Sequence, residues 1–335
     1  MLPNAFIVGA QKSGTTTLCH ALERHPQAVV STPKEPAYFS RTANLIEPER
    51  YEACFQVKNG LTPRAVIDGS TAYMVDPLAP SRIRAMLGGD LRFVFCLREP
   101  VARAISAYWH QAKKGRERRP LTEVLSFASV TLEAAKLEEQ ERLERAVKEG
   151  MIELADCPER FDDPLWNFRY LRNSLYADDL ERYRSSFGGA RMKIVLFEDL
   201  VRDPKALLAS VASFLDLDLT EFPADLDSHR NATALMRAPR LSHMLQKLPG
   251  RRLLRHIPGY ASVRTALFFR SPPPASDALK AALRQLAAPE VTRLEVMLDQ
   301  DLVGSWGGVL QPKQAGSSRT GKRPPGRPEE KRSVA

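Results

Sequence analysis

Short apolar runs recur along the first two thirds of the chain, and turn residues and then helical patterns follow most of them. Runs of this length without alternating polar positions are typical of strands that are buried on both faces of a parallel sheet. Strands that alternate with helices predict an α/β fold, with a mostly parallel sheet between two layers of helices. The predicted strands are Ala5–Val8, Ala28–Ser31, Ala65–Asp68, Arg92–Leu97 and Lys193–Phe197.

Helical patterns fill much of the remaining chain. Thr131–Gly150 is rich in Glu, Lys and Arg and predicts a solvated helix with ion pairs four residues apart. Tyr170–Phe187 has apolar residues at helical spacing, and Gly188-Gly189 ends the pattern. Ser276–Trp306 is again helical. Between these segments, Ser228–Arg270 is basic, is interrupted by prolines and shows no clear strand.

The composition is that of a globular protein, with 335 residues of which 43% are hydrophobic and 27% charged. We predict one domain over residues 1–311 and a basic, disordered tail over 312–335, where Pro, Gly, Ser and Arg predominate. No apolar run reaches the roughly 18 residues of a membrane helix, and the first residues have no secretory-signal pattern. The four cysteines and six histidines lack metal-binding spacings. We therefore expect a cytoplasmic protein without a bound metal.

The net charge of +9 is concentrated in two segments. Residues 228–270 carry nine Lys and Arg and no acidic residue, and the tail carries seven Lys and Arg with two Glu. The rest of the chain is therefore net negative. This distribution argues against a specific nucleic-acid partner, and it favours a local anionic ligand or a peripheral membrane contact through the basic segments.

The first predicted strand runs directly into a glycine-bearing loop, Gly9-Ala-Gln-Lys-Ser-Gly-Thr-Thr16, before a helix. A strand, such a loop and a helix N-terminus form an anion site, because backbone N–H groups and the helix dipole converge there. The spacing of Gly9 and Gly14 matches the first half of the nucleoside-triphosphate P-loop, but Thr15 occupies its lysine position. Lys12 lies inside the loop instead, which suits a shorter 5′ anion. The alternative is a tight turn with a solvated lysine.

Two other strand ends carry candidate residues. Arg98 ends the fourth strand and Ser106 lies about two helical turns further on, so an arginine fork and a hydroxyl group can hold a second phosphate. The alternative is a surface pair between Arg98 and Glu99 and an unimportant serine. Glu35 follows the second strand and can accept a proton from an attacking hydroxyl or amine; otherwise it is an exposed loop residue. Lys34 beside it is a solvated charge or a ligand contact.

Together these segments resemble the sulfotransferases that use 3′-phosphoadenosine 5′-phosphosulfate (PAPS). The resemblance is closest to the heparan-sulfate-type sulfotransferase domain, in its soluble bacterial branch. It extends over most of the chain before the tail. The segments that carry it are Ile7–Thr16, Lys34–Phe39, Leu97–Tyr108, Phe197–Pro204 with Phe214-Leu215, and Leu294–Trp306.

This resemblance implies a P-loop-like fold in three α/β/α layers and a role for each candidate residue. Arg98 and Ser106 would bind the 3′-phosphate of the donor, and Glu35 would be the general base. Lys12 would also stabilise charge on the bridging oxygen as the sulfuryl group transfers in line to a hydroxyl or amine of a carbohydrate or glycolipid. The product would be adenosine 3′,5′-bisphosphate (PAP), without a metal. The residues implied for the 5′-phosphosulfate loop are Lys12, Ser13, Gly14, Thr15 and Thr16.

The chain departs from the family pattern at three places. Gly69 stands where heparan-sulfate enzymes commonly have a lysine, in the run Asp68-Gly-Ser70. Glu99 replaces the usual Asp of the Arg-Asp-Pro motif. The membrane anchor and the cysteine-paired nucleotide loop of the Golgi members have no counterpart in the sequence. Residues 228–270 would then cover the donor or bind the acceptor.

Two other classes of function compete with this interpretation. A P-loop kinase or NTPase needs a phosphate-reaching lysine and Mg²⁺ ligands, and Thr15 in the lysine position argues against it. A non-enzymatic binder of an anionic polymer or membrane surface would use the basic segments, but it leaves the loop, Glu35 and Arg98 without a role. Trp109 and His110 can line an acceptor cleft, although such residues in a helix more often belong to the core or its rim.

Overall fold

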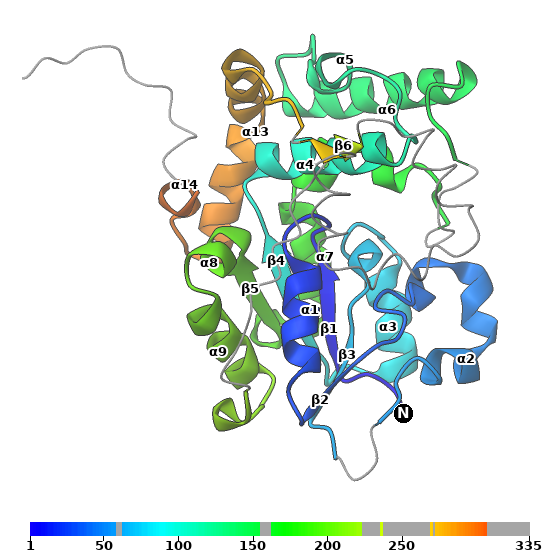
Figure 1. Cartoon of the computed structure of the whole chain (residues 1–335), viewed down its shortest axis with the longest axis vertical. Coiled ribbons are helices and arrows are strands. Elements are labelled where there is room, and N and C mark those ends of the chain that lie inside the picture. The colour runs from blue at the N-terminus through cyan, green and yellow to red at the C-terminus, as the bar shows by residue number, and fades with distance from the viewer. Residues whose placement is uncertain (58–61, 155–161, 223–234, 237–268, 271, 307–335) are drawn as a thin grey trace, which may run out of the picture.

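A parallel sheet of five strands forms the centre of the computed structural model, which describes residues 1–57, 62–154, 162–222, 235–236, 269–270 and 272–306 (Figure 1). The strand order is β2-β3-β1-β4-β5, and every neighbouring pair is parallel. All five predicted strands are confirmed, with ends that differ by at most one residue. The strands are β1 (Ala5–Gly9), β2 (Ala28–Val30), β3 (Ala65–Asp68), β4 (Arg92–Leu97) and β5 (Met192–Leu196).

Helices cover both faces of this sheet, so the predicted three layers are present. In chain order the helices are α1 (Thr15–Glu23), α2 (Pro48–Glu52), α3 (Ala79–Leu87), α4 (Pro100–Lys113), α5 (Leu121–Leu125), α6 (Leu132–Lys148), α7 (Ala177–Phe187), α8 (Phe197–Arg202), α9 (Pro204–Phe214), α13 (Asp277–Leu298) and α14 (Leu302–Ser305).

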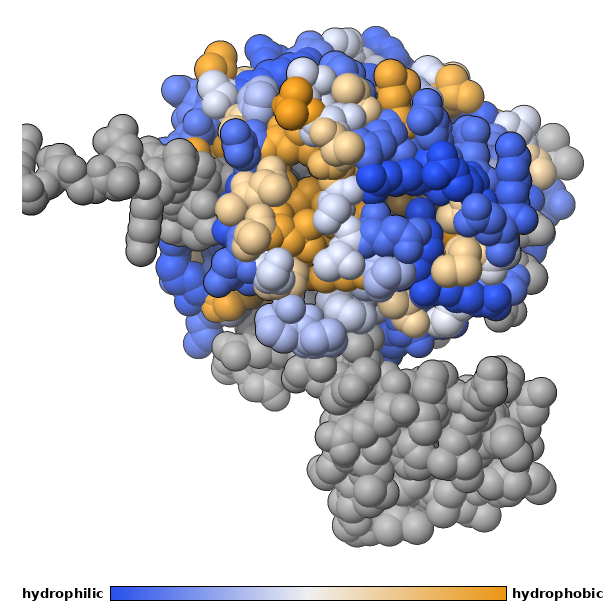
Figure 2. Space-filling view, turned by 90° about the horizontal axis from the view of Figure 1, so that it is seen from above, coloured by the Kyte–Doolittle hydropathy of each residue, from blue (hydrophilic) through white to orange (hydrophobic). Residues whose placement is uncertain are grey.

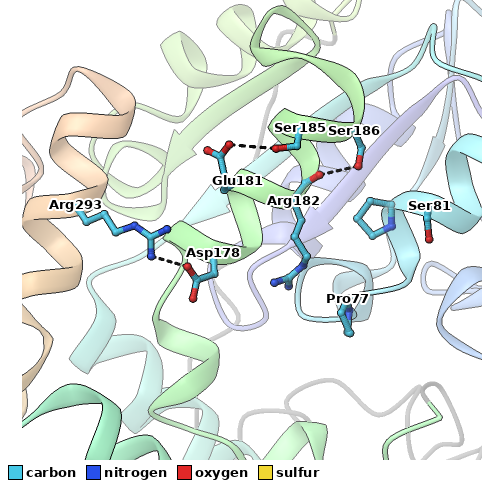
Figure 3. A pocket seen from close by; sticks show the side chains of 9 residues that line it. Pro77, Ser81, Asp178, Glu181, Arg182, Ser185, Ser186 and Arg293 are labelled. Atoms are coloured by element: carbon cyan, nitrogen blue, oxygen red, sulfur yellow. Dashed lines mark hydrogen bonds and ion pairs between the residues drawn. The ribbon is translucent and has the colours of Figure 1, made fainter.

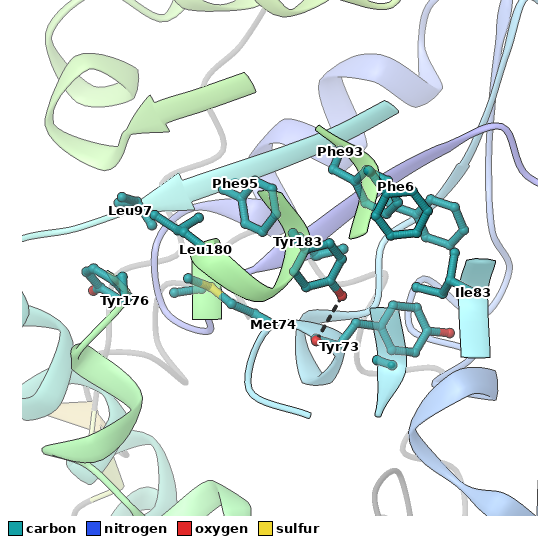
Figure 4. Packing of buried hydrophobic residues seen from close by; sticks show 14 of the residues in the cluster. Phe6, Tyr73, Met74, Ile83, Phe93, Phe95, Leu97, Tyr176, Leu180 and Tyr183 are labelled. Atoms are coloured by element: carbon teal, nitrogen blue, oxygen red, sulfur yellow. Dashed lines mark hydrogen bonds between the residues drawn. The ribbon is translucent and has the colours of Figure 1, made fainter. Parts of the chain in front are cut away.

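Successive side chains of each strand enter the two layers alternately, as a pleated strand requires. Phe6, Phe93 and Phe95 belong to the cluster that contains α3, α7 and the second half of α13 (Figure 4). Ile7 and Val94 belong to the cluster that α1, α8 and α9 close on the other face. Burial on both faces explains why the strands are continuous apolar runs in the sequence.

The strand order creates a crevice beside β1. From β1 the chain passes through α1 to the edge strand β2, and after β3 it crosses to the other side of β1 at β4. In parallel sheets of this kind, ligands bind at the carboxyl ends of the strands where the chain changes direction. The loops after β1 and β4 are therefore expected to share one site.

A helical cap lies over this end of the sheet (Figure 1). It consists of α4, α5, α6 and the first half of α13, which share an apolar cluster of their own. Figure 2 looks onto this end of the molecule, where apolar side chains gather near the middle and hydrophilic ones surround them. Because α4 follows β4 directly, its first turns lie next to the crevice.

The predicted helix over Tyr170–Phe187 is partly wrong, because α7 begins only at Ala177. The residues before it form a short 3₁₀ turn, which buried polar groups hold in place. Glu139 accepts hydrogen bonds from the N–H groups of Leu171 and Arg172 at 2.7 and 2.9 Å. Arg103 donates to the carbonyl of Tyr170 at 2.6 Å. These long-range contacts override the local helical pattern.

The other helical predictions agree with the structure at their N-termini. Thr131 caps α6 and Ser276 caps α13, while Asp299 in the left-handed conformation ends α13 before α14. The basic segment contains a two-stranded antiparallel pair that we did not predict, β6 (Leu235–Met236) with β7 (Phe269–Arg270). The rest of that segment and the predicted tail over 312–335 lie outside the described residues.

We expect Glu290→Ala to destabilise the fold, because Glu290 on α13 caps a different helix. Its Oε1 accepts the N–H of Ala177, the first residue of α7, at 2.6 Å, and no side chain of α7's own N-cap residue does so. Loss of a cap costs about 0.5–2 kcal/mol of the free energy of unfolding. Urea denaturation measures it, with the exposed Glu133→Ala as control. Equal stability of the two variants would contradict this role.

Candidate functional site

The loop between β1 and α1 has the backbone of an anion site. Gly14 is the N-cap residue of α1, with a φ of 88°, and no side chain caps the helix. The N–H groups of the first turn therefore lack side-chain partners of the usual kind. Ser13 is fully buried, and its Oγ has no hydrogen-bond partner within the described part of the chain. A bound anion, which accepts hydrogen bonds, could pair with both the first-turn N–H groups and the Ser13 hydroxyl.

Gly14 is required at its position by packing as well as by conformation. A Cβ atom there would lie 2.6 Å from Cδ2 of Leu200 and 3.1 Å from Cδ2 of Phe197. The same Phe197 ring lies 4.4 Å below the guanidinium carbon of Arg98, in a cation–π contact. Phe197 thus joins the loop after β1 to the residue that follows β4. We did not assign it a role from the sequence, although its place at the end of the fifth predicted strand was a signal.

Arg98 is held against the loop and not by the neighbouring glutamate. Its Nη1 donates to the carbonyl of Lys12 at 3.1 Å, and its own carbonyl accepts the hydroxyl of Tyr176 at 2.9 Å. Its Nε is buried without a hydrogen-bond partner among the described residues. Glu99 instead caps α4 by accepting the N–H of Ala102 at 2.5 Å. The alternative of an Arg98–Glu99 surface pair is therefore wrong.

Arg98 and Ser106 line the same cleft, which has a volume of about 480 Å³. Trp109, one turn beyond Ser106 on α4, forms part of its wall. Lys280 and Arg284 add two cationic side chains from the first turns of α13. We did not single these two out from the sequence, although cations four residues apart share one helix face. The cleft therefore gathers three cations, a hydroxyl group and the carboxylate of Glu99, which pairs with Arg284 at 3.4 Å.

Positive charge also surrounds Lys12. Burial, together with the charges of Arg98, Lys114, Lys113 and Arg103, lowers the pKa of Lys12 to about 8. His110 on α4 lies in the same electrostatic environment. Burial, with the charges of Lys12 and its neighbours, lowers the pKa of His110 to about 3, so this imidazole is neutral near pH 7. A bound anion would relieve the mutual repulsion of the cations.

Glu35 lies on the other side of the loop, where the β2 and β3 ends meet. Its Oε1 accepts hydrogen bonds from Nζ of Lys34 at 3.2 Å and from Oγ1 of Thr71 at 3.3 Å. Its side chain is 19% exposed, so it is not the solvated loop glutamate of the alternative interpretation. Burial raises the pKa of the Cys19 thiol on α1 to about 11, and the charges of Lys34 and Glu35 also act on that thiol. Glu35 is therefore close to the helix that follows the loop.

Thr15 and Thr16 open α1, with Thr15 buried and Thr16 exposed at the loop. The structure thus brings Lys12 and Arg98 into contact, and places Arg98 and Ser106 on one cleft. Glu35 belongs to the β3 side of β1, whereas Arg98 belongs to the β4 side. The predicted residues therefore surround the carboxyl end of β1 from both directions.

A second hollow of about 430 Å³ lies between α3, α7 and α13 and contains none of the residues predicted for the site (Figure 3). Its charged groups already have partners, and Arg182 donates to Asp179 at 2.5 Å. Asp178 pairs with Arg293 at 2.5 Å, and Glu181 accepts the hydroxyl of Ser185 at 3.2 Å. We assign it no role in the chemistry.

No group of three His, Cys, Asp or Glu side chains within the described residues is arranged to hold a metal ion. No helix in the described ranges is both long and apolar enough to cross a bilayer.

Comparison with known proteins places the chain in a family. A family model described as a sulfotransferase domain matches residues 2–245. The chain belongs to the sulfotransferase family. The heparan sulfate glucosamine 3-O-sulfotransferase 3B1 of Mus musculus is 31% identical over 221 residues, covering 64% of this chain and 46% of the mouse protein. The membrane-associated sulfotransferase kil1 of Dictyostelium discoideum is 24% identical over 273 residues, which cover 66% of this chain and 57% of that protein.

The chain spans about half the length of the curated relatives it matches. A solved structure, a sulfotransferase from Alicyclobacillus acidocaldarius, resembles it over 91% of this chain and 99% of that one, with a TM-score of 0.61 and 24% identity. This likeness confirms the fold, and the family match confirms the resemblance found in the sequence.

Proposed function

We propose that this member of the sulfotransferase family is an enzyme that transfers a sulfuryl group from PAPS to a hydroxyl or amine of an acceptor. The observation that carries the proposal is the junction of the loop and Arg98. There, the start of α1 has no side-chain cap, and the buried Ser13 hydroxyl and the buried Nε of Arg98 have no hydrogen-bond partner among the described residues. Donors of this kind, next to several cations, fit a ligand that carries anions at two positions.

The loop residues from Lys12 to Thr16 would hold the 5′-phosphosulfate through the first-turn N–H groups of α1 and the Lys12 ammonium. Arg98 and Ser106 would hold the 3′-phosphate in the adjoining cleft, together with Lys280 and Arg284. Binding of the 5′ group by the loop and of the 3′-phosphate by the cleft explains why Lys12 lies inside the loop, earlier than the lysine of a nucleoside-triphosphate P-loop.

Glu35 would act as the general base. In the transfer, a bond forms between the acceptor oxygen or nitrogen and sulfur, and the bond from sulfur to the bridging phosphate oxygen breaks. The acceptor proton moves to the Glu35 carboxylate, and the electron pair of the broken bond stays on the phosphate. Lys12 stabilises the negative charge that develops there. His110 is a weaker candidate, because a proton on its imidazole would face the Lys12 charge.

The acceptor that we propose is a carbohydrate or glycolipid. The printed names of the mouse and human relatives specify a glucosamine of heparan sulfate, which supports a sugar acceptor without specifying it for this chain. A reaction without a metal, a cytoplasmic location and a role for residues 228–270 at the donor or acceptor remain part of the same proposal. Incubation of the enzyme with PAPS and a panel of sugar acceptors, followed by mass spectrometry, tests it. A product heavier by about 80 Da, the mass of SO₃, is expected.

The charge on Lys12 should make donor binding depend on pH. An ammonium group is charged below its pKa, so Lys12 with a pKa of about 8 loses its charge as the pH rises through that value. We expect kcat/KM for PAPS to fall above about pH 8 in the wild type. This descending limb of the pH profile should be absent in Lys12→Ala. Steady-state rates from pH 6 to pH 10 measure it. The same descending limb in both enzymes would assign the titration to another group.

A further inference from the structure

We propose that Lys34 is a positioning residue for Glu35. Its ammonium group, which is also hydrogen-bonded to the backbone carbonyl of Gly69, holds the Glu35 carboxylate in place. The inference rests on the proposed function, in which Glu35 is the base. Nζ of Lys34 donates to Oε1 of Glu35 at 3.2 Å and to the carbonyl of Gly69 at 3.0 Å. The ammonium group is therefore held by the Glu35 carboxylate, which lies in the loop after β2, and by the Gly69 carbonyl, which lies after β3.

The backbone around this ion pair is braced on both sides. The hydroxyl of Ser31 donates to the carbonyl of Lys34 at 2.7 Å and accepts the N–H of Gly69 at 3.4 Å. The N–H of Ala37 donates to Oγ of Ser70 at 2.9 Å. The loop after β2 is thus hydrogen-bonded to the loop after β3 before and after Glu35. A lysine anchored in this way loses less conformational freedom on pairing than a lysine on an open surface.

Gly69 provides the room that Lys34 needs. A Cβ atom on residue 69 would lie 3.0 Å from the carbonyl oxygen of Lys34 and 3.2 Å from its Cγ, and 2.9 Å from Sγ of Cys19. No larger side chain fits there without displacing the Lys34 stem. With Gly69 in place of the lysine of the family pattern, the cation beside Glu35 is therefore Lys34, which comes from the loop after β2.

The orientation of the carboxylate follows from these contacts. Lys34 and Thr71 both donate to the same oxygen, Oε1, from different directions. Two donors on one oxygen restrict the rotation of the carboxylate, and a base must be oriented toward the proton that it accepts. Both side chains are mostly buried, at 21% exposure for Lys34 and 19% for Glu35, so water competes poorly for the pair.

Lys34→Met tests the inference, because methionine keeps much of the apolar stem and removes the ammonium. Crystal structures of the wild type and the variant need no acceptor. We expect the Glu35 side chain to change rotamer or to lose order in Lys34→Met, with the backbone of the loop unchanged. Lys136→Met is the matched control, since Lys136 is also 21% exposed and pairs with Glu133 at 2.7 Å on α6. An unmoved and equally ordered Glu35 would overturn the inference.

Kinetics on the acceptor found by mass spectrometry separate positioning from other effects. Lys34→Met should lower kcat by about 10- to 150-fold, the range for loss of a hydrogen bond to a charged group, and leave PAP affinity unchanged. Lys34→Arg should recover part of the loss. In a Glu35→Gln background, Lys34→Met should change kcat less than about twofold, because the two residues act as one unit.

The same series distinguishes the two ways of failing. Equal losses from Lys34→Met in both backgrounds would mean that Lys34 acts without Glu35, and would overturn the positioning role alone. Near-full turnover of Glu35→Gln by itself would instead remove the base from the proposed function, whatever Lys34 does.

Discussion

Replacing Glu35 with glutamine is expected to lower kcat by about 10²- to 10⁴-fold while the affinity for PAP stays near the wild-type value. Glutamine keeps the shape of the side chain and still accepts hydrogen bonds from Lys34 and Thr71 through its carbonyl oxygen. It has no basicity, so the acceptor proton must leave to water. Because Glu35 lies on the β3 side of the loop and Arg98 on the β4 side, the substitution should not affect the donor. Steady-state kinetics with PAP titrations measure both quantities.

A matched control separates the loss of a base from the loss of a partly buried negative charge. Glu138 on α6 is 17% exposed and is hydrogen-bonded to Ser129 and Arg142, and it is not among the residues assigned to the site. Glu138→Gln should turn over at the wild-type rate. Wild-type turnover by Glu35→Gln near neutral pH would contradict the assignment of the base.

Replacing Arg98 with alanine is expected to weaken PAP binding by about 10- to 150-fold, which corresponds to the roughly 1.5–3 kcal/mol of a hydrogen bond to a charged group. Adenosine 5′-monophosphate lacks the 3′-phosphate, so its affinity should change little. Arg98→Lys should fall between the two enzymes, because an ammonium keeps the charge but cannot form a fork. Calorimetric titration of each variant with both nucleotides gives the comparison.

Arg98 also contacts the Lys12 carbonyl and the Phe197 ring, so its removal can disturb the loop. The monophosphate titration detects such a disturbance, since that nucleotide depends on the loop alone. Arg202→Ala, which removes an exposed arginine from α8, is the control for net charge. Equal weakening of PAP and the monophosphate by Arg98→Ala would place the residue at the 5′ end of the donor.

The sheet was predictable because each strand is buried on both faces and therefore reads as one apolar run. The loop was predictable because its parts are contiguous, from Gly9 to Thr16, and because glycine occupies two of its positions with positive φ, Gly9 and Gly14. Local sequence patterns predicted the wrong conformation where residues that are distant in the chain determine it. The 3₁₀ turn before α7 depends on Glu139 and Arg103, which lie more than 30 residues away in the chain.

The same distinction separates the site residues that were found from those that were missed. Lys12, Arg98 and Glu35 each lie in the segment that follows a strand, so the topology alone brings them to one end of the sheet. Lys280 and Arg284 come from a helix near the end of the described chain, and only tertiary packing places them on the cleft with Ser106. Glu99 reads as a partner of Arg98 in the sequence but is the cap of α4.

The most direct test of the donor assignment is a titration of the wild-type chain with PAP and, separately, with ATP and Mg²⁺, followed by isothermal calorimetry. We expect PAP to bind with a stoichiometry of one in the presence of EDTA, and ATP with Mg²⁺ to bind at least about tenfold more weakly, about 1.4 kcal/mol less favourably. Tighter binding of ATP with Mg²⁺ than of PAP would contradict it and would restore the kinase or NTPase interpretation.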